Sequence, residues 1–326
     1  MTRTASILLL LLLACGRERA TPAAAAWPTA RSACAAPTGP RHDWRHRRSE
    51  LVARLGDAHH VASDAIVAAG ATTELHGKVA YGKISKDLEE EDVVVFLSSA
   101  GPRGDCAPRQ LGTATTNDDG RVSFDAGKLA AGFHRYWLIV AGDGTTAEAG
   151  VWVLPGPTPA VIFDVDGTLT TSDGELFDDL IGSGAAAFDG AAAVAQRWAD
   201  KGYLIVYVTG RPYPLRALTR RWLDAGGFPD GPLFTPERLR DGVPTRDGVG
   251  AYKREAFTTL QASGLRVVRA YGNAATDVCA YAQAGIPPAL TYIIGTPTPC
   301  DAFTVPHALA GYVDHLADVE RQPTVR

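Results

Sequence analysis

The sequence has little excess charge of either sign. Its 326 residues include 32 Lys and Arg against 36 Asp and Glu, which gives a formal net charge of -4 at pH 7. A protein that holds nucleic acid by its phosphates needs a basic surface. The charge balance therefore gives no indication of a nucleic-acid partner. The hydrophobic fraction of 46% is that of an ordinary globular chain.

Long apolar runs are also lacking, apart from one short run near the N-terminus. Residues 7–13 are Ile followed by six Leu, and Arg3 precedes them. The run is too short to span a membrane, and a basic start with a short apolar segment is typical of a secretory signal peptide. It ends in Leu12-Leu13-Ala14-Cys15, which resembles a bacterial lipobox.

The lipobox resemblance implies cleavage of residues 1–14 and lipidation of Cys15. Acyl chains on this residue would hold the protein at a membrane surface. We therefore expect an exported, membrane-anchored bacterial lipoprotein on the periplasmic or outer-membrane side. The alternative is a plain cleaved signal peptide followed by a chance cysteine.

Cysteine is sparse, with five residues in the chain. Without Cys15 four remain, and an even number behind an export signal favours disulfides. Four cysteines allow three pairings. Cys279 and Cys300 both lie in the last part of the chain, so we expect them to pair, which leaves Cys34 with Cys106. No cysteine lies beside a plausible base, so none is expected to be a nucleophile.

The length suggests about two domains. Residues 15–45 are rich in Ala, Pro and Thr and predict a low-complexity tether. Residues 46–155 predict a helical segment and an all-β, immunoglobulin-like sandwich, because short strand-like runs alternate with turn signals. The clearest of these, at 117–120 and 142–144, are expected to be hairpin turns. No catalytic constellation is visible there. Residues 155–159 read as a stiff linker, and residues 156–326 alternate strand and helix as a doubly wound parallel sheet does.

One stretch of the second domain places two carboxylates at the end of an apolar run. Residues 161–163 are Val-Ile-Phe, typical of a strand buried on both faces, and Asp164 and Asp166 follow before the turn at Gly167. Close carboxylates repel each other unless a cation lies between them, and their oxygens suit Mg²⁺. Taken alone, the same residues are equally typical of a polar turn after a strand.

Three further polar clusters follow in order along the chain. Thr209-Gly210-Arg211 ends the apolar run 203–208, and Lys253 lies in the helix-like segment 252–262. Asn273 and Asp277 follow the apolar run 265–271. Each cluster directly follows a strand or opens a helix. This is the placement that an active site at the carboxyl ends of parallel strands requires.

These motifs together resemble the haloacid dehalogenase (HAD) superfamily of phosphatases, and more narrowly the lipin (LNS2) family of phosphatidate phosphatases. The resemblance covers roughly residues 160–296. It rests on Asp-Val-Asp-Gly-Thr-Leu-Thr at 164–170 running into Thr-Ser-Asp at 171–173, Thr-Gly-Arg-Pro at 209–212, Gly-Pro-Leu at 231–233, and Tyr-Gly-Asn-x-x-Thr-Asp at 271–277. It implies a HAD-like fold and a Mg²⁺-dependent phosphatase.

The resemblance also implies a role for each residue. Asp164 would be the nucleophile, and Asp166 the general acid and then the general base. Mg²⁺ would be held by the Asp164 carboxylate, the Asp166 backbone carbonyl and either Asn273 or Asp277, although many HAD enzymes carry Asp at the position of Asn273. The residues expected to bind the substrate phosphate are Thr209, Gly210, Arg211 and Lys253, of which Thr209 and Lys253 are also counted as catalytic. Arg211 could instead cap the helix that Pro212 opens.

A separate cap domain is lacking, because the gaps 170–203 and 211–253 are too short for a domain of at least ~50 residues. We expect a short flap and a helix at 185–200 in the first gap, and a helix at 215–225 with a strand near Leu233 in the second. The site would then be open enough to reach a lipid headgroup.

The sequence thus predicts an enzyme acting on phosphatidate or a related phosphomonoester. Two alternatives stay open, a phosphatidate-binding module without turnover and a scavenging phosphatase for soluble esters. The presence of Asp166 favours catalysis over binding alone.

Overall fold

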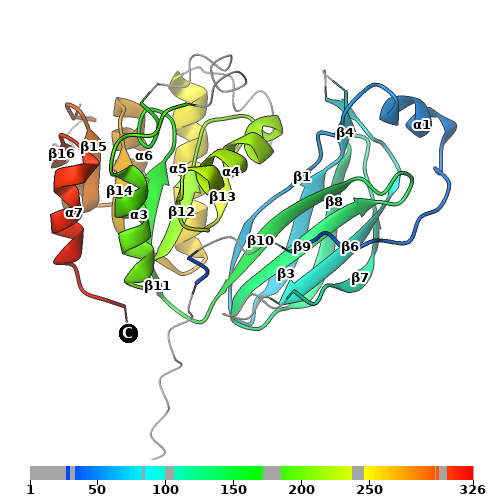
Figure 1. The fold of residues 1–326 in the computed structure, drawn as a ribbon, viewed down its shortest axis with the longest axis horizontal. Helices are drawn as coiled ribbons and strands as arrows, with labels where there is room; N and C mark the ends of the chain where they lie inside the picture. The colour runs from blue at the N-terminus through cyan, green and yellow to red at the C-terminus, as the bar shows by residue number, and fades with distance from the viewer. Residues whose placement is uncertain are drawn as a thin grey trace, which may run out of the picture.

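The computed structural model describes residues 27–29, 34–82, 85–99, 106–171, 185–236, 246–297, 299–300 and 307–325. They form an N-terminal β-sandwich beside an α/β domain (Figure 1). The predicted signal peptide, Cys15 and most of the predicted flap, including residues 172–173, lie outside the described residues. Among the helices in those described ranges, none is long and apolar enough to cross a membrane.

The N-terminal domain consists of two antiparallel-rich sheets packed face to face, as predicted. One has the order β1-β3-β8 and the other β2-β10-β9-β6-β7, and a small ribbon β4-β5 lies beside them. The helix α1 (Arg47–Ala53) precedes the strands. The strands are β1 (Val61–Ala62), β2 (Ala65–Ala68), β3 (Thr72–Lys78), β4 (Ala80–Tyr81), β5 (Lys86–Asp87), β6 (Asp92–Ser99), β7 (Arg109–Thr115), β8 (Arg121–Lys128), β9 (Gly132–Val140) and β10 (Thr146–Leu154).

The two predicted turns have different roles in the sandwich. The turn at 142–144 joins β9 and β10, which pair antiparallel, so the predicted hairpin is confirmed there. The turn at 117–120 joins β7, which pairs with β6, to β8, which pairs with β3. The hairpin predicted at this turn is therefore wrong, because the chain crosses from one sheet to the other. Gly120 allows the crossing with φ +66°, where a Cβ would lie 2.5 Å from the Val79 carbonyl oxygen.

The predicted tether is wrong in its last part, because residues 34–45 lie against the sandwich. The Trp44 ring fills the space that a Cβ on Gly142 would need. The Arg41 guanidinium donates to the Asp143 carbonyl, and the Arg45 guanidinium donates to the Asp92 carboxylate. The low-complexity composition of this segment gave no indication of these contacts, because each is made by a single long side chain.

The α/β domain is built on one six-stranded parallel sheet of order β13-β12-β11-β14-β15-β16. The doubly wound sheet predicted from the sequence is present. Its strands are β11 (Thr158–Asp164), β12 (Leu204–Val208), β13 (Leu233–Phe234), β14 (Leu265–Gly272), β15 (Thr291–Ile294) and β16 (His307–Leu309). Its helices are α3 (Ala191–Asp200), α4 (Arg216–Ala225), α5 (Arg246–Ala262), α6 (Ala275–Gln283) and α7 (Tyr312–Glu320), with short 3₁₀ turns η1 (Tyr213–Leu215) and η3 (Pro288–Leu290).

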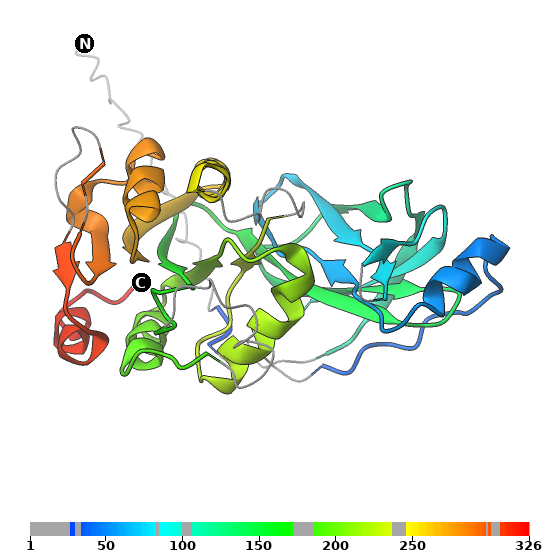
Figure 2. The same cartoon turned by 90° about the horizontal axis from the view of Figure 1, so that it is seen from above.

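Side-chain alternation along the strands builds a core on each face of the sheet. In β11, Val161 and Phe163 pack with residues of α3, α4 and α7. Ala160 and Ile162 point the other way, into a core with α5 and α6. Figure 2 shows these two sets of helices on opposite faces.

The core on the α5 and α6 face continues into the β-sandwich. Phe133, Trp152 and Leu154 from β9 and β10 belong to the same buried cluster as Ile162. Only residues 155–157 separate β10 from β11. The two domains are therefore joined by a shared core as well as by a short linker.

Both expected disulfides are confirmed. Cys279 on α6 is bonded to Cys300, and Cys34 is bonded to Cys106 of the sandwich. Each bond ties a segment without regular structure to its own domain.

We predict that Gly231→Ala destabilises the protein by about 3 kcal/mol, at the upper end of overpacking costs. A Cβ on Gly231 would lie 2.0 Å from the Ile205 carbonyl oxygen, in the middle of the β12 strand. The midpoint of urea unfolding checks this. Gly156→Ala is the control, because a Cβ there meets nothing within 4 Å and its midpoint should stay unchanged. Equal midpoints for the two variants would contradict the prediction.

Candidate active site

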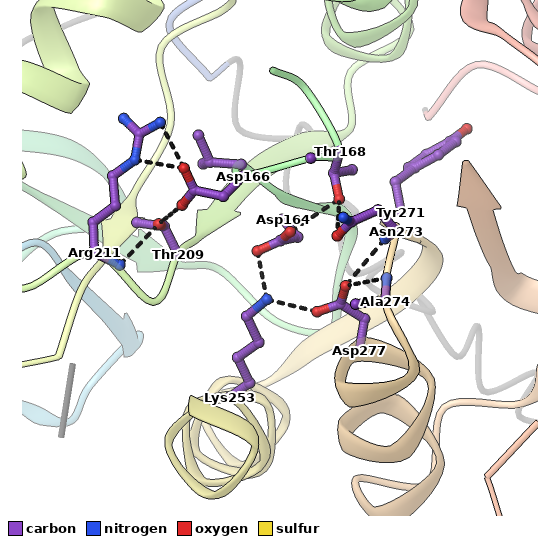
Figure 3. Close-up of polar contacts among 12 residues, drawn as sticks. Asp164, Asp166, Thr168, Thr209, Arg211, Lys253, Tyr271, Asn273, Ala274 and Asp277 are labelled. Atoms are coloured by element: carbon purple, nitrogen blue, oxygen red, sulfur yellow. Dashed lines mark hydrogen bonds and ion pairs between the residues drawn. The ribbon is translucent and has the colours of Figure 1, made fainter. Parts of the chain in front are cut away.

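The polar clusters predicted from the sequence meet at the carboxyl end of the parallel sheet. Asp164 is the last residue of β11, and Thr209 and Asn273 directly follow β12 and β14. β12 and β14 lie on either side of β11, so the strand order reverses at this point. Open α/β sheets bind their ligands in the crevice at such a reversal. Lys253 reaches the same place from α5 (Figure 3).

A buried ion triad forms one half of the site. The Lys253 ammonium lies 2.6 Å from Asp164 Oδ1 and 2.6 Å from Asp277 Oδ1. All three residues are at most 5% exposed. An unpaired charge at such depth would be strongly unfavourable, so the lysine and the carboxylates depend on each other.

The Asp164 carboxylate is also fixed by a residue that the sequence reasoning missed. The Thr168 hydroxyl donates to Asp164 Oδ2 at 2.9 Å and lies 3.3 Å from Asn273 Oδ1. The Tyr312 hydroxyl of α7 donates to the Thr168 carbonyl at 2.9 Å. Thr168 is the threonine of the Asp-Gly-Thr motif and lies four residues after Asp164, where the chain turns back, so the motif could have indicated this contact.

Asp277 has both carboxylate oxygens engaged. Its Oδ1 accepts from Lys253, and its Oδ2 accepts from the backbone N–H groups of Asn273 at 3.0 Å and Ala274 at 3.1 Å, at the start of α6. A Cβ on Gly272 would lie 2.6 Å from the Asp277 Cβ, so glycine leaves room for this carboxylate. Of the two candidate metal ligands, Asn273 therefore fits better than Asp277.

Asp166 points to the other side of β11, away from the triad (Figure 3). Its Oδ2 accepts from the Thr209 hydroxyl at 2.7 Å, and its Oδ1 lies 2.8 Å from Arg211 Nε and 2.7 Å from an Arg211 terminal nitrogen. The Asp166 side chain is 20% exposed, so it can reach a ligand from this position. Arg211 was expected to bind phosphate or to cap a helix. In the structure the Arg211 guanidinium instead contacts the Asp166 carboxylate. Gly210 connects Thr209 to Arg211 in the chain.

The net charge of the site favours a divalent cation. Burial, opposed by Lys253 and assisted by the neighbouring Asp277 and Asp166, raises the pKa of Asp164 to about 7. Three carboxylates face two cationic side chains, Lys253 and Arg211, which leaves one net negative charge. In the described part of the chain no group of three His, Cys, Asp or Glu side chains could hold a metal. The available donors are instead the Asp164 carboxylate, the Asp166 carbonyl and the Asn273 amide, oxygen donors of the kind that Mg²⁺ takes.

A cleft lies between the two domains near the site, although none of the site residues described above lines it. Its volume is about 970 Å³. Tyr213, two residues after Arg211, and Phe234, whose carbonyl accepts from the Thr209 N–H, line it on the α/β side. Lys78 and Arg121 line it on the sandwich side. The cleft offers space for a substrate much larger than phosphate.

We predict a pH-dependent stability cost from Asp164 in metal-free protein. The folded-state pKa of about 7 exceeds the ordinary value of 3.8. The stability that the neutral form contributes is complete below pH 3.8 and is lost as the pH rises towards 7. Relative to Asp164→Asn, the free energy of unfolding of the wild type should fall by up to about 4 kcal/mol, at about 1.4 kcal/mol per pKa unit.

Urea unfolding of both proteins in a chelator, from pH 4 to pH 8, measures this difference. Added Mg²⁺ should reduce the fall, because it favours the ionised carboxylate. Parallel stability curves for the two proteins would show that Asp164 titrates normally.

Two domain models of one protein family match this chain. Residues 161–295 match the LNS2 domain of PITM 1-3, and residues 58–153 match the beta-sandwich domain of PITM 1-3. The α/β domain thus has an LNS2-like fold, as the sequence motifs indicated, and the sandwich that precedes it is also similar to that family.

Curated relatives resemble the chain across both domains. The chain is 32% identical over 288 residues to membrane-associated phosphatidylinositol transfer protein 1 of Rattus norvegicus, covering 87% of this chain and 22% of that protein. It is 28% identical over 288 residues to the retinal degeneration B protein of Drosophila melanogaster, covering 87% of this chain and 22% of that protein. The chain thus spans about a fifth of the length of these relatives.

Solved structures resemble the α/β half. A HAD-like phosphatase from Mesorhizobium loti has 19% identity and a TM-score of 0.39, covering 51% of this chain and 85% of that one. A D,D-heptose 1,7-bisphosphate phosphatase from B. bronchiseptica, complexed with magnesium and phosphate, has 16% identity and a TM-score of 0.37, covering 50% of this chain and 98% of that one.

Proposed function

We propose that the protein is a Mg²⁺-dependent phosphomonoester hydrolase that acts on phosphatidate or a related lipid phosphate. The observation that carries this proposal is the difference between the surroundings of the two carboxylates at the end of β11. Asp164 is buried between Lys253 and Thr168, whereas Asp166 lies on the more exposed side with Thr209 and Arg211. Two carboxylates in such different surroundings suit a nucleophile and an acid/base group.

In the first step a carboxylate oxygen of Asp164 attacks phosphorus. The bond between phosphorus and the ester oxygen breaks, and the leaving oxygen takes the proton of Asp166, so an aspartyl-phosphate and an alcohol result. Lys253 and Thr168 hold the Asp164 carboxylate in one orientation. Lys253 also offsets the negative charge of the incoming phosphate.

In the second step a water molecule attacks the phosphorus of the aspartyl-phosphate. The Asp166 carboxylate takes a proton from this water, and the bond between phosphorus and Asp164 breaks. Inorganic phosphate leaves, and both residues return to their starting protonation states. The contacts with Arg211 and Thr209 hold the Asp166 side chain in place for this step.

Mg²⁺ would be held by the Asp164 carboxylate, the Asp166 backbone carbonyl and Asn273, and when bound it supplies positive charge to the phosphoryl oxygens. Asp277 keeps Lys253 and the start of α6 in place.

A lipid phosphate is the substrate class that the surroundings of the site support. The LNS2 match and the lipin-type motifs agree on this class, and the relatives are named as phosphatidylinositol transfer proteins. The nearby cleft of about 970 Å³ has room for more than a phosphate group.

The second candidate function is a module that binds phosphatidate without hydrolysing it. The name of the relatives called phosphatidylinositol transfer proteins favours it, since it describes transfer and not hydrolysis. A binding module needs cationic groups for the phosphate but has no use for a second carboxylate at the nucleophile. Asp166, held by Thr209 and Arg211, therefore favours hydrolysis.

The test is phosphate release, with and without Mg²⁺, from phosphatidate in mixed micelles and from a small soluble phosphomonoester. We expect Mg²⁺-dependent release that is faster from the micellar lipid. Equal or faster release from the soluble ester would identify a general phosphatase. Binding of phosphatidate vesicles without any release would identify the binding module.

We predict that Asp164→Asn lowers the rate of phosphate release by at least about 10³-fold while the fold is kept, because no nucleophile remains. Asp200→Asn, an exposed carboxylate at the end of α3, is the matched control and should keep the wild-type rate. Substantial phosphate release by Asp164→Asn would mean that another group attacks phosphorus.

We also propose that the protein is exported and anchored through a lipid on Cys15. The two disulfides suit an oxidising compartment. Labelling of cells with radioactive palmitate should mark the wild type and leave Cys15→Ser unmarked. Labelling of both proteins, or of neither, would contradict lipidation at this residue.

A further inference from the structure

A carboxylate of the β-sandwich is buried at the interface with the α/β domain. Asp64 lies between β1 and β2, and its side chain is 1% exposed. Its Oδ2 lies 2.7 Å from Arg216 and 2.8 Å from Arg220, and it accepts from the Leu233 N–H at 2.8 Å. Its Oδ1 accepts from the Gly150 N–H of the sandwich at 2.8 Å.

These contacts make Asp64 a fixed charge, not a surface ion pair. Burial alone would raise its pKa, but the charges of Arg216 and Arg220 and the two backbone N–H groups lower it below the ordinary value. Arg216 and Arg220 are four residues apart and so share one face of α4. Arg216 also donates to the Leu233 carbonyl, so the cluster joins α4, β13 and the sandwich.

The same helix continues the chain of contacts into the site. Thr219 of α4 accepts from the Arg211 guanidinium at 3.1 Å. The other side of that guanidinium holds Asp166. Arg211 is 3% exposed and Thr219 is completely buried, so solvent does not replace this contact. The position of α4 therefore orients the Asp166 carboxylate through Arg211, together with the direct contact from Thr209.

The opposite half of the site is held by other elements. Lys253 comes from α5, Asp277 from α6, and Asn273 follows β14. β14 lies on the other side of β11 from β12 and β13, and α5 and α6 pack against each other and against β14. A shift of α4 would thus act on Asp166 before it acts on the nucleophile or on the donors for Mg²⁺.

We propose that Asp64 is a positioning residue through which the β-sandwich orients Asp166, by way of α4, Thr219 and Arg211. The proposal rests on the proposed function, in which Asp166 is the acid and base. It gives the sandwich an indirect part in the reaction, since none of its residues touches the substrate phosphate in this scheme.

The test separates steps that need the acid from steps that do not. The alcohol leaving phosphatidate must be protonated, whereas the phenolate leaving p-nitrophenyl phosphate needs no proton. We would therefore measure single-turnover release of diacylglycerol from phosphatidate micelles and of nitrophenolate from p-nitrophenyl phosphate, in the wild type and in Asp64→Asn.

We expect Asp64→Asn to slow diacylglycerol release roughly tenfold or more and nitrophenolate release less than about threefold, because acid/base catalysis contributes factors of this size or larger. The Mg²⁺ concentration that gives half of the maximal rate should stay unchanged. A merely structural role would lower both release rates by the same factor, through the fraction of folded protein.

Thr219→Val keeps the test decisive if Asp64→Asn does not fold. It removes the hydroxyl that accepts from Arg211 and leaves the buried charges intact. It should reproduce the selective loss on phosphatidate. Leu154→Val is the control, because it loosens the shared core between the domains away from Gly150 and α4, and it should not distinguish the two substrates.

The outcomes separate the two proposals. Equal slowing on both substrates, or no slowing, in Thr219→Val and in any folded Asp64→Asn would overturn the role of Asp64 and leave the proposed function in place. Wild-type protein that releases nothing from either substrate would overturn the proposed function itself.

Discussion

The buried ammonium of Lys253 between Asp164 and Asp277 is the interaction on which the rest of the active-site domain depends. Three charges at this depth are tolerable only because each one has its partner at 2.6 Å. The contact joins the end of β11, the helix α5 and the start of α6. Any register of the sheet that moved one of them would leave a charge alone in the core. The architecture and the chemistry are therefore specified by the same residues.

The second constraint is the junction between the domains. β10 passes into β11 through residues 155–157, and the aromatic residues Phe133 and Trp152 of the sandwich complete the core on one face of the parallel sheet. Without the sandwich, this apolar surface and the cationic face of α4 would both be exposed to water. The sandwich thus acts as a layer of the α/β fold, in the place where another protein could carry a helix.

Local pattern predicted most of the fold, and the order of polar clusters predicted where the site lies. Strand ends such as Asp164 and helix starts such as Asp277 follow from short-range rules, and the parallel sheet brings them together. The partner of Arg211 could not be predicted, because an arginine can reach several groups and packing of α4 decides among them. The same holds for the crossing at Gly120, since sheet membership depends on contacts far apart in the chain.

The shared core also bears on how this pair of domains can change during evolution. A gene fragment encoding the parallel sheet alone would carry an uncovered apolar face and the arginines of α4 without Asp64, so it could not move freely between proteins. The two domains should be inherited and recombined as one unit. The similarity to the transfer proteins runs through both domains in a single stretch of 288 residues, as such joint descent requires.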